Sequence, residues 1–337
     1  MKRKTKRVQA FRSKSYMYAA PMTAVMLTSV LLTTSLCLPS SLLNPVHAAA
    51  TTSSATTSTE KQTVSAATAQ QSYNLFVQRL QKPSTLGLAR ATLVNRIQQF
   101  DTNRASMAVL QLENAYNTHF AYAEDLIYRE SVQDALMRKY KWGMTMRQAV
   151  SLMSNAADRQ AMQMLADMGY RLETSEGIFY PIIDYPAFSP FFAFIRPDIR
   201  DYIQIMSAEA KQPTTSDAGI IIAPTDLVQR GLAKEAFLNK YAVSNRRAAV
   251  EQEYRLSQYY IFYGSDNTPI FDSQTLEIDP QFYQEYRKLL NNYSAQQIKG
   301  SKILTNLSDL MKLVEQSGGK STNAVDQFLE KRVGTLF

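Results

Sequence analysis

Aromatic rings and carboxylates supply the chemistry that this sequence could perform. Residues 177–202, GIFYPIIDYPAFSPFFAFIRPDIRDY, are rich in Phe and Tyr and contain four Pro and three Asp. Ligand sites favour apolar floors with a few polar groups, so this stretch predicts a groove for a sugar or peptide. Its floor would consist of Tyr180, Tyr185, Phe188, Phe191, Phe192 and Phe194, and its polar groups would be Asp184, Asp198 and Asp201.

The alternative for this stretch is plain packing. Aromatic side chains bury large areas and dominate protein cores, and proline interrupts regular elements. The ordinary role of these residue types therefore favours rings that fill an irregular gap between helices.

Carboxylates alone suffice for one class of catalysis. Glycan cleavage needs an acid and in some enzymes a second carboxylate, and the candidates for this role are Glu130, Asp184 and Glu209. Arg129-Glu130-Ser131 slightly resembles the Glu-Ser pair of lytic transglycosylases, whose fold is also helical. The resemblance covers two residues, and the Gly-Leu-Met-Gln-type sequence expected downstream in that family is missing, so no family is assigned.

Cysteine and histidine are too scarce for most other chemistries. Cys37 is the only cysteine, and the two histidines are His47 and His119. Beyond residue 48 the chain therefore lacks thiol nucleophiles, cysteine zinc ligands and disulfides, and it cannot build a site that needs two histidines. His119 is expected to be a structural residue, and neither a metal nor a cofactor is expected.

The positive charge is concentrated at the N-terminus. The formal net charge is +8, but residues 1–48 hold seven Lys or Arg and no acidic residue, which leaves 30 basic and 29 acidic side chains in the remainder. A phosphate-binding groove needs clustered surplus Lys and Arg. Nucleic acid is therefore not an expected partner.

The first 48 residues are predicted to be a secretory signal peptide. A long basic segment, similar to that of Gram-positive export signals, precedes an apolar run of about 15 residues and the sequence Val46-His47-Ala48, which predicts cleavage after Ala48. The alternative is a retained membrane anchor, although spanning a bilayer takes about 20 apolar residues. With cleavage, the chain would meet the membrane only transiently, through this leader.

Residues 49–71 are almost entirely Ala, Thr, Ser and Gln, which predicts a flexible spacer. From residue 72 onward, helical periodicity dominates, with start signals at Asp101, Thr145 and Asn155. Two short extended runs, at 170–173 and 178–184, predict a hairpin with Gly177 in its loop. The expected fold is mainly α, an irregular multi-helix domain over 72–337 with one short mid-chain β-hairpin.

The domain organisation has one open alternative. The hairpin at 170–184 would separate 72–169 from 190–337, but the connecting segment is apolar. Linkers between independent domains are usually polar, so a single core is expected.

These features favour an exported, envelope-associated protein that is secreted or bound to the cell wall of a Gram-positive-type organism. The expected function is non-catalytic binding or organisation of a cell-wall or surface component, with a wall glycan or an exported protein as partner. The alternative is a carboxylate-dependent, peptidoglycan-cleaving enzyme.

Overall fold

A computed structural model describes residues 55–334 of the chain, with side chains from Ala67 onward. The chain divides into two compact units, Met1–Thr68 and Ala69–Phe337. Of the first unit only residues 55–68, the opening part of one helix, are described, and the predicted leader and its cleavage position lie outside the described residues.

The structure is mainly helical, as predicted: over residues 55–334 it has 68% helix in 14 helices, with small two-stranded antiparallel sheets. The single cysteine leaves no partner for a disulfide within the chain. No helix of the part that the structure describes is long and apolar enough to cross a membrane.

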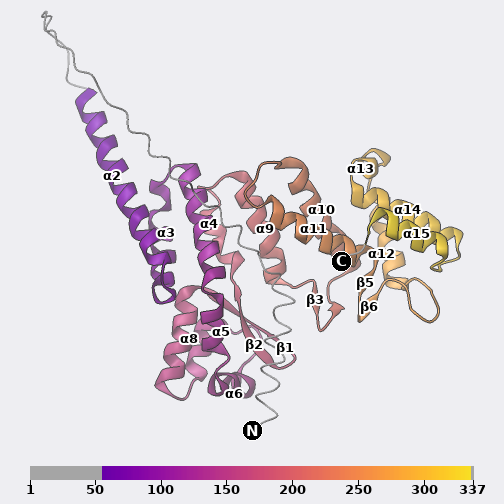
Figure 1. Cartoon of the computed structure of the whole chain (residues 1–337), viewed down its shortest axis with the longest axis horizontal. Coiled ribbons are helices and arrows are strands. Elements are labelled where there is room, and N and C mark those ends of the chain that lie inside the picture. Colours follow the sequence, from indigo (N-terminus) through magenta and orange to yellow (C-terminus); the bar gives the residue numbers. More distant parts are fainter. Residues whose placement is uncertain (1–54, 335–337) are drawn as a thin grey trace, which may run out of the picture. The chain divides into compact units, whose positions relative to one another are not determined.

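The segment before the hairpin is helical throughout (Figure 1). Its elements in chain order are α2 (Ala55–Leu80), η1 (Pro83–Thr85), α3 (Leu86–Arg96), η2 (Ile97–Gln99), α4 (Thr102–Thr118), α5 (Phe120–Ile127), α6 (Glu130–Lys139), α7 (Met146–Ala149), η3 (Val150–Leu152) and α8 (Ala156–Met168). Helix α2 includes residues 55–71 of the predicted spacer. Ala and Gln are good helix formers, and a spacer role for this segment stays a prediction.

Local signals set several of these helix ends. The Asp101 carboxylate accepts the backbone N–H groups of Asn103 and Arg104, and Thr145 and Gln148 form a reciprocal capping box at α7. Asn155 caps α8, which stops at Gly169 with φ +94°. Helices α4 and α5 meet at His119, whose Nε2 lies 2.8 Å from the carbonyl oxygen of Leu80.

The predicted hairpin is present. Strands β1 (Tyr170–Ser175) and β2 (Ile178–Ile183) pair in antiparallel register, from Tyr170 opposite Ile183 to Ser175 opposite Ile178. Its turn has two residues, Glu176 and Gly177, both with positive φ, the geometry that favours glycine. The loop is shorter than the sequence suggests because Thr174 and Ser175 belong to β1. Strand β2 packs on α5 and α6 (Figure 1).

The segment after the hairpin contains the remaining helices and two minimal hairpins that the sequence did not predict. The elements are η4 (Tyr185–Phe191), α9 (Pro197–Lys211), β3 (Thr215–Ser216), β4 (Gly219–Ile220), α10 (Pro224–Lys240), α11 (Arg247–Phe262), β5 (Gly264–Ser265), β6 (Thr268–Pro269), α12 (Pro280–Asn291), α13 (Ala295–Lys299), α14 (Lys302–Gln316) and α15 (Asn323–Arg332). Helix α11 begins at Arg247, and the nearby Ser244 hydroxyl donates to Asp198 at 2.7 Å and accepts the Arg246 N–H at 3.3 Å.

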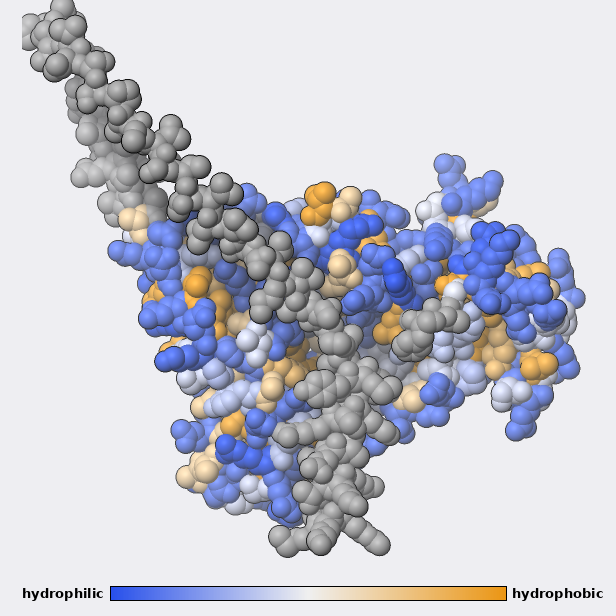
Figure 2. Space-filling view, in the orientation of Figure 1, coloured by the Kyte–Doolittle hydropathy of each residue, from blue (hydrophilic) through white to orange (hydrophobic). Residues whose placement is uncertain are grey.

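Two hydrophobic clusters fill this unit. The first combines α2 to α9 and the β1–β2 hairpin with residues of α10 and α11, and its largest fully buried side chains include Tyr116, Tyr202 and Phe191. The second is built from α10 to α15 and includes Tyr286, whose hydroxyl donates to the carbonyl oxygen of Ile261 at 2.7 Å. Helices α10 and α11 lie side by side and contribute to both clusters. Figure 2 shows scattered hydrophobic residues on a largely hydrophilic face.

Candidate functional site

The aromatic stretch lies mostly inside the first cluster. Tyr185, Phe188 and Phe191 are buried, and the Phe188 ring centroid lies 5.8 Å from that of Tyr185 and 5.9 Å from that of Phe191. Tyr180, Phe192 and Phe194 are half-buried. The three buried rings pack on protein neighbours, as the core-packing alternative expects. A ligand-binding role for the half-buried Tyr180, Phe192 and Phe194 stays a prediction.

The three aspartates of the stretch have separate surroundings. Asp198 is buried and accepts two hydrogen bonds from the Arg196 guanidinium, at 3.0 and 3.1 Å, and one from the Ser244 hydroxyl at 2.7 Å. Asp184 is half-buried just before η4. Asp201 faces a different neighbour, Lys240 of helix α10.

Two tyrosines of the stretch bind a buried carboxylate that the sequence did not indicate. Glu113 on α4 is 2% exposed and accepts the hydroxyl protons of Tyr185, at 2.7 Å, and of Tyr202, at a short distance. Its second oxygen accepts the Nε–H and Nη2–H of Arg246, at 2.9 and 2.7 Å. We call these four residues the Glu113 cluster. It ties α4, η4 and α9 to the residue that precedes α11.

The negative charge of Glu113 is balanced by Arg246 within the cluster. Burial, followed by the negative charge of Glu113, raises the pKa of Tyr185 and of Tyr202 well above the usual value of 10.0. Both hydroxyls therefore remain proton donors to the carboxylate at any physiological pH. The Arg246 guanidinium also lies 5.6 Å from the centroid of the Tyr202 ring, a cation–π distance. Both carboxylate oxygens and both tyrosine hydroxyls of the cluster have hydrogen-bond partners, which is typical of a structural network.

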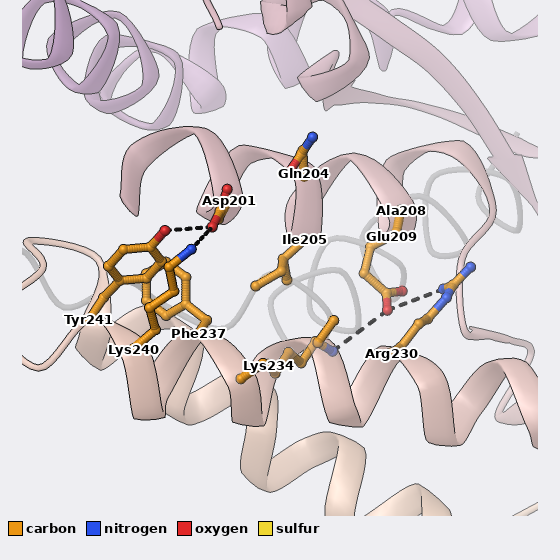
Figure 3. A pocket seen from close by; sticks show the side chains of 12 residues that line it. Asp201, Gln204, Ile205, Ala208, Glu209, Arg230, Lys234, Phe237, Lys240 and Tyr241 are labelled. Atoms are coloured by element: carbon orange, nitrogen blue, oxygen red, sulfur yellow. Dashed lines mark hydrogen bonds and ion pairs between the residues drawn. The ribbon is translucent and has the colours of Figure 1, made fainter. Parts of the chain in front are cut away.

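A pocket of about 350 Å³ opens between α9 and α10 (Figure 3). Helix α9 lines it with Asp201, Gln204, Ile205, Ala208 and Glu209, and α10 and the following residue line it with Arg230, Ala233, Lys234, Ala236, Phe237, Lys240 and Tyr241. Its middle is apolar, and charged side chains stand at both ends (Figure 3). The lining residues of each helix recur at spacings of mostly three and four residues, and such residues share one helix face. Each helix therefore turns one face toward the pocket.

Asp201 forms one end of the pocket. Its carboxylate accepts the Tyr241 hydroxyl at 2.6 Å and pairs with Lys240 at 3.4 Å and Arg200 at 3.1 Å. Burial alone would raise the pKa of Asp201, but the hydrogen bonds from Tyr241 and Arg200 and the nearby positive charges outweigh it and hold the pKa below its usual value of 3.8. Asp201 is therefore ionised at neutral pH.

Glu209 forms the other end. It pairs with Arg230 at 3.2 Å and with Lys234 at 3.7 Å, and it accepts the backbone N–H and the hydroxyl of Thr214. Lys234 is only 4% exposed and also contacts the Ser257 hydroxyl at 2.8 Å and Glu253 at 3.5 Å. The three cations of the pocket outnumber its two carboxylates, which gives the lining a small positive excess.

The three catalytic candidates do not assemble into one site around this pocket. Glu209 lines it, Glu130 is exposed in the first turn of α6, and Asp184 precedes η4. The second carboxylate of the pocket is Asp201, eight residues before Glu209, which corresponds to about 12 Å along the helix axis. Paired glycosidase carboxyl groups lie roughly 5–10 Å apart. No cluster of three His, Cys, Asp or Glu with metal-binding geometry occurs among the described residues.

Sequence reasoning named Asp201 and Glu209 but none of their partners. Arg230, Lys234 and Tyr241 recur at spacings of four and seven residues, which is a signal in the sequence for a shared helix face. Glu113 gave a weaker signal, as one acidic residue on the apolar face of α4. That α9 packs beside α10, and that Arg246 reaches Glu113, depends on contacts between distant segments.

No protein-family model matches the chain, and no curated protein and no solved structure shows significant similarity to it.

Proposed function

We propose that the protein is a non-catalytic binding module of the cell envelope, and that its ligand occupies the α9–α10 pocket. One observation carries the proposal. A pocket of about 350 Å³ has an apolar middle with polar groups placed at both ends, the usual composition and size of a ligand site.

The lining indicates the chemistry of the ligand. Ile205 and Phe237 offer apolar contact in the middle, while Lys240 at one end and Arg230 at the other offer N–H donors (Figure 3). A short peptide-like segment with an apolar side chain between carbonyl or carboxylate groups fits this order. Peptide stems of a cell wall and termini of exported proteins both supply such segments.

The state of the carboxylates supports binding over catalysis. A general acid in glycan cleavage needs a raised pKa so that it holds a proton near neutral pH. Asp201 has a lowered pKa, and Glu209 is engaged by Arg230, Lys234 and Thr214. Both groups are arranged to orient cationic and hydroxyl donors along the pocket.

The experiment mixes the protein with purified Gram-positive-type cell-wall sacculi and records co-sedimentation together with release of soluble fragments. The proposal predicts binding without release. Ala233→Phe should lower the apparent affinity about tenfold or more, equivalent to about 1.4 kcal/mol, because the exposed Ala233 lines the pocket and a phenyl ring would fill it.

Ala248→Phe is the matched control, since Ala248 is also exposed on a helix but does not line the pocket. Equal binding by both variants would contradict the pocket as the site. Release of fragments would favour the peptidoglycan-cleaving alternative, and Glu130→Gln, Asp184→Asn and Glu209→Gln would then identify the acid. If the protein neither co-sediments with the sacculi nor releases fragments, wall material is excluded as the ligand.

A further inference from the structure

A tight turn holds the only tryptophan of the chain in solvent. Trp142 lies in residues 140–145, between α6 and α7, and is 85% exposed. The Met144 N–H donates to the Lys141 carbonyl oxygen at 3.0 Å, and Gly143 takes φ +85°, a conformation that favours glycine. We call residues 140–145 the Trp142 turn. Its hydrogen bond and its glycine define a built turn that presents the indole ring outward.

The sequence around this turn is strongly basic. Residues 135–157 contain four cations, Arg138, Lys139, Lys141 and Arg147, and no acidic residue. This local surplus contrasts with the near neutrality of the chain beyond residue 48, and it is independent of the basic leader.

Two of these four charges are balanced by nearby acids, and two are not. Arg138 pairs with Asp134 at 3.7 Å and Arg147 with Asp167 at 2.8 Å. Within the described residues, Lys139 and Lys141 enter no ion pair, and the Lys139 ammonium donates to the Leu152 carbonyl oxygen at 3.2 Å. Both lysines are exposed, one on each side of Tyr140.

An exposed indole beside uncompensated lysines fits one kind of surface. Tryptophan prefers the boundary between water and lipid, where its ring leaves water while its N–H stays hydrated. Lysines near an anionic bilayer gain electrostatic attraction. Met137, in the last turn of α6, is 53% exposed and adds an apolar side chain.

From these observations we propose that the Trp142 turn docks the folded protein onto an anionic membrane surface. The indole enters the headgroup region, and Lys139 and Lys141 contact lipid phosphates. This differs from the expectation that only the leader meets the membrane, and it adds a second contact surface to the ligand pocket of the proposed function. An anionic wall polymer shares the phosphate chemistry but offers no interface for the indole.

The single tryptophan makes the test direct, because its fluorescence reports on this turn alone even where the basic leader also binds lipid. The full chain is titrated with vesicles of phosphatidylcholine, with or without phosphatidylglycerol, and with a soluble polyphosphate. Docking predicts a blue shift of the emission and reduced quenching by acrylamide with the phosphatidylglycerol vesicles only, and high salt should reverse both changes.

Charge reversal at one position gives the matched comparison. Lys141→Glu should raise the vesicle concentration that gives half of the emission shift by roughly 25-fold. This corresponds to about fivefold for each of the two units of charge changed. Lys299→Glu, at an exposed lysine of α13, should leave it unchanged. An unshifted emission with anionic vesicles, an equal response of both variants, or the same blue shift with polyphosphate would each overturn the proposal.

Discussion

The Glu113 cluster and the Asp201 end of the pocket use the same three groups, a tyrosine hydroxyl, a carboxylate and a cation. In the first, Tyr202 donates to Glu113, which pairs with Arg246, and all are enclosed. In the second, Tyr241 donates to Asp201, which pairs with Lys240, and the side chains of Asp201 and Lys240 are 26% and 62% exposed. Tyr202 and Asp201 are neighbours on α9 and point to different sides of it.

A single helix, α9, contributes to both the core and the pocket. Successive residues of an α-helix diverge by about 100°, from 3.6 residues per turn. One face of α9 therefore joins the core through Tyr202 while another lines the pocket with Asp201 and Glu209. The same groups stabilise the fold where water is excluded, and they present donors to a ligand where water enters.

The strongest test of the contrast removes the buried carboxylate. Glu113→Gln should lower the free energy of unfolding by about 3–5 kcal/mol, because Arg246 would keep its charge in a nearly enclosed position without a counter-charge. Urea denaturation measures this change. Glu251→Gln, which breaks the exposed pair with Arg255, should cost less than about 1 kcal/mol. Similar losses in the two variants would show that the Glu113 cluster is not a stability element.

Removing single hydroxyl groups sharpens the comparison while each ring is kept. Tyr202→Phe should lower the free energy of unfolding by about 1–3 kcal/mol, since a buried charge-assisted hydrogen bond is lost. Tyr241→Phe should cost less than about 1 kcal/mol, because water can reach the Asp201 carboxylate. Thermal and urea unfolding of both variants provide the measurement, and the reverse order would contradict the assignment of roles.

The smallest expected effect is a pH dependence at Asp201. Its pKa is below 3.8 in the folded protein, so its contribution to stability is present above pH 3.8 and is lost as the pH falls through the lower folded-state value. Asp201→Asn should therefore be less stable than the wild type at neutral pH by under about 1 kcal/mol, given its partial exposure. The two proteins should converge on acidification, and a difference that grew toward low pH would contradict the lowered pKa.

Much of the fold followed from local signals in the sequence. Asp101, Thr145 and Asn155 cap helices where their side chains predict. Caps and turns are formed by residues close in sequence, so they can be read without knowing the packing.

Less of the candidate site than of the fold could be predicted from the sequence. Carboxylates are frequent in the sequence, and only their partners in the fold show what each one does. Glu113 is paired with Arg246, which lies 133 residues away in the sequence, whereas Glu209 lines a pocket. The aromatic stretch was correctly recognised as unusual, but its residue types do not say whether rings face a ligand or one another. Tyr185 and Phe188 face the core because η4 folds back over α9, a tertiary contact.

The central claim is that the α9–α10 pocket holds the ligand, and site-specific thiol alkylation tests it most directly. In a Cys37→Ser background, where no other cysteine remains, Ala233→Cys and Ala248→Cys each place one thiol on an exposed helix position. With sacculi bound, alkylation of the thiol at position 233 should slow several-fold while that at position 248 keeps its rate. Binding that leaves the thiol at 233 as reactive as before would place the ligand elsewhere and contradict the account.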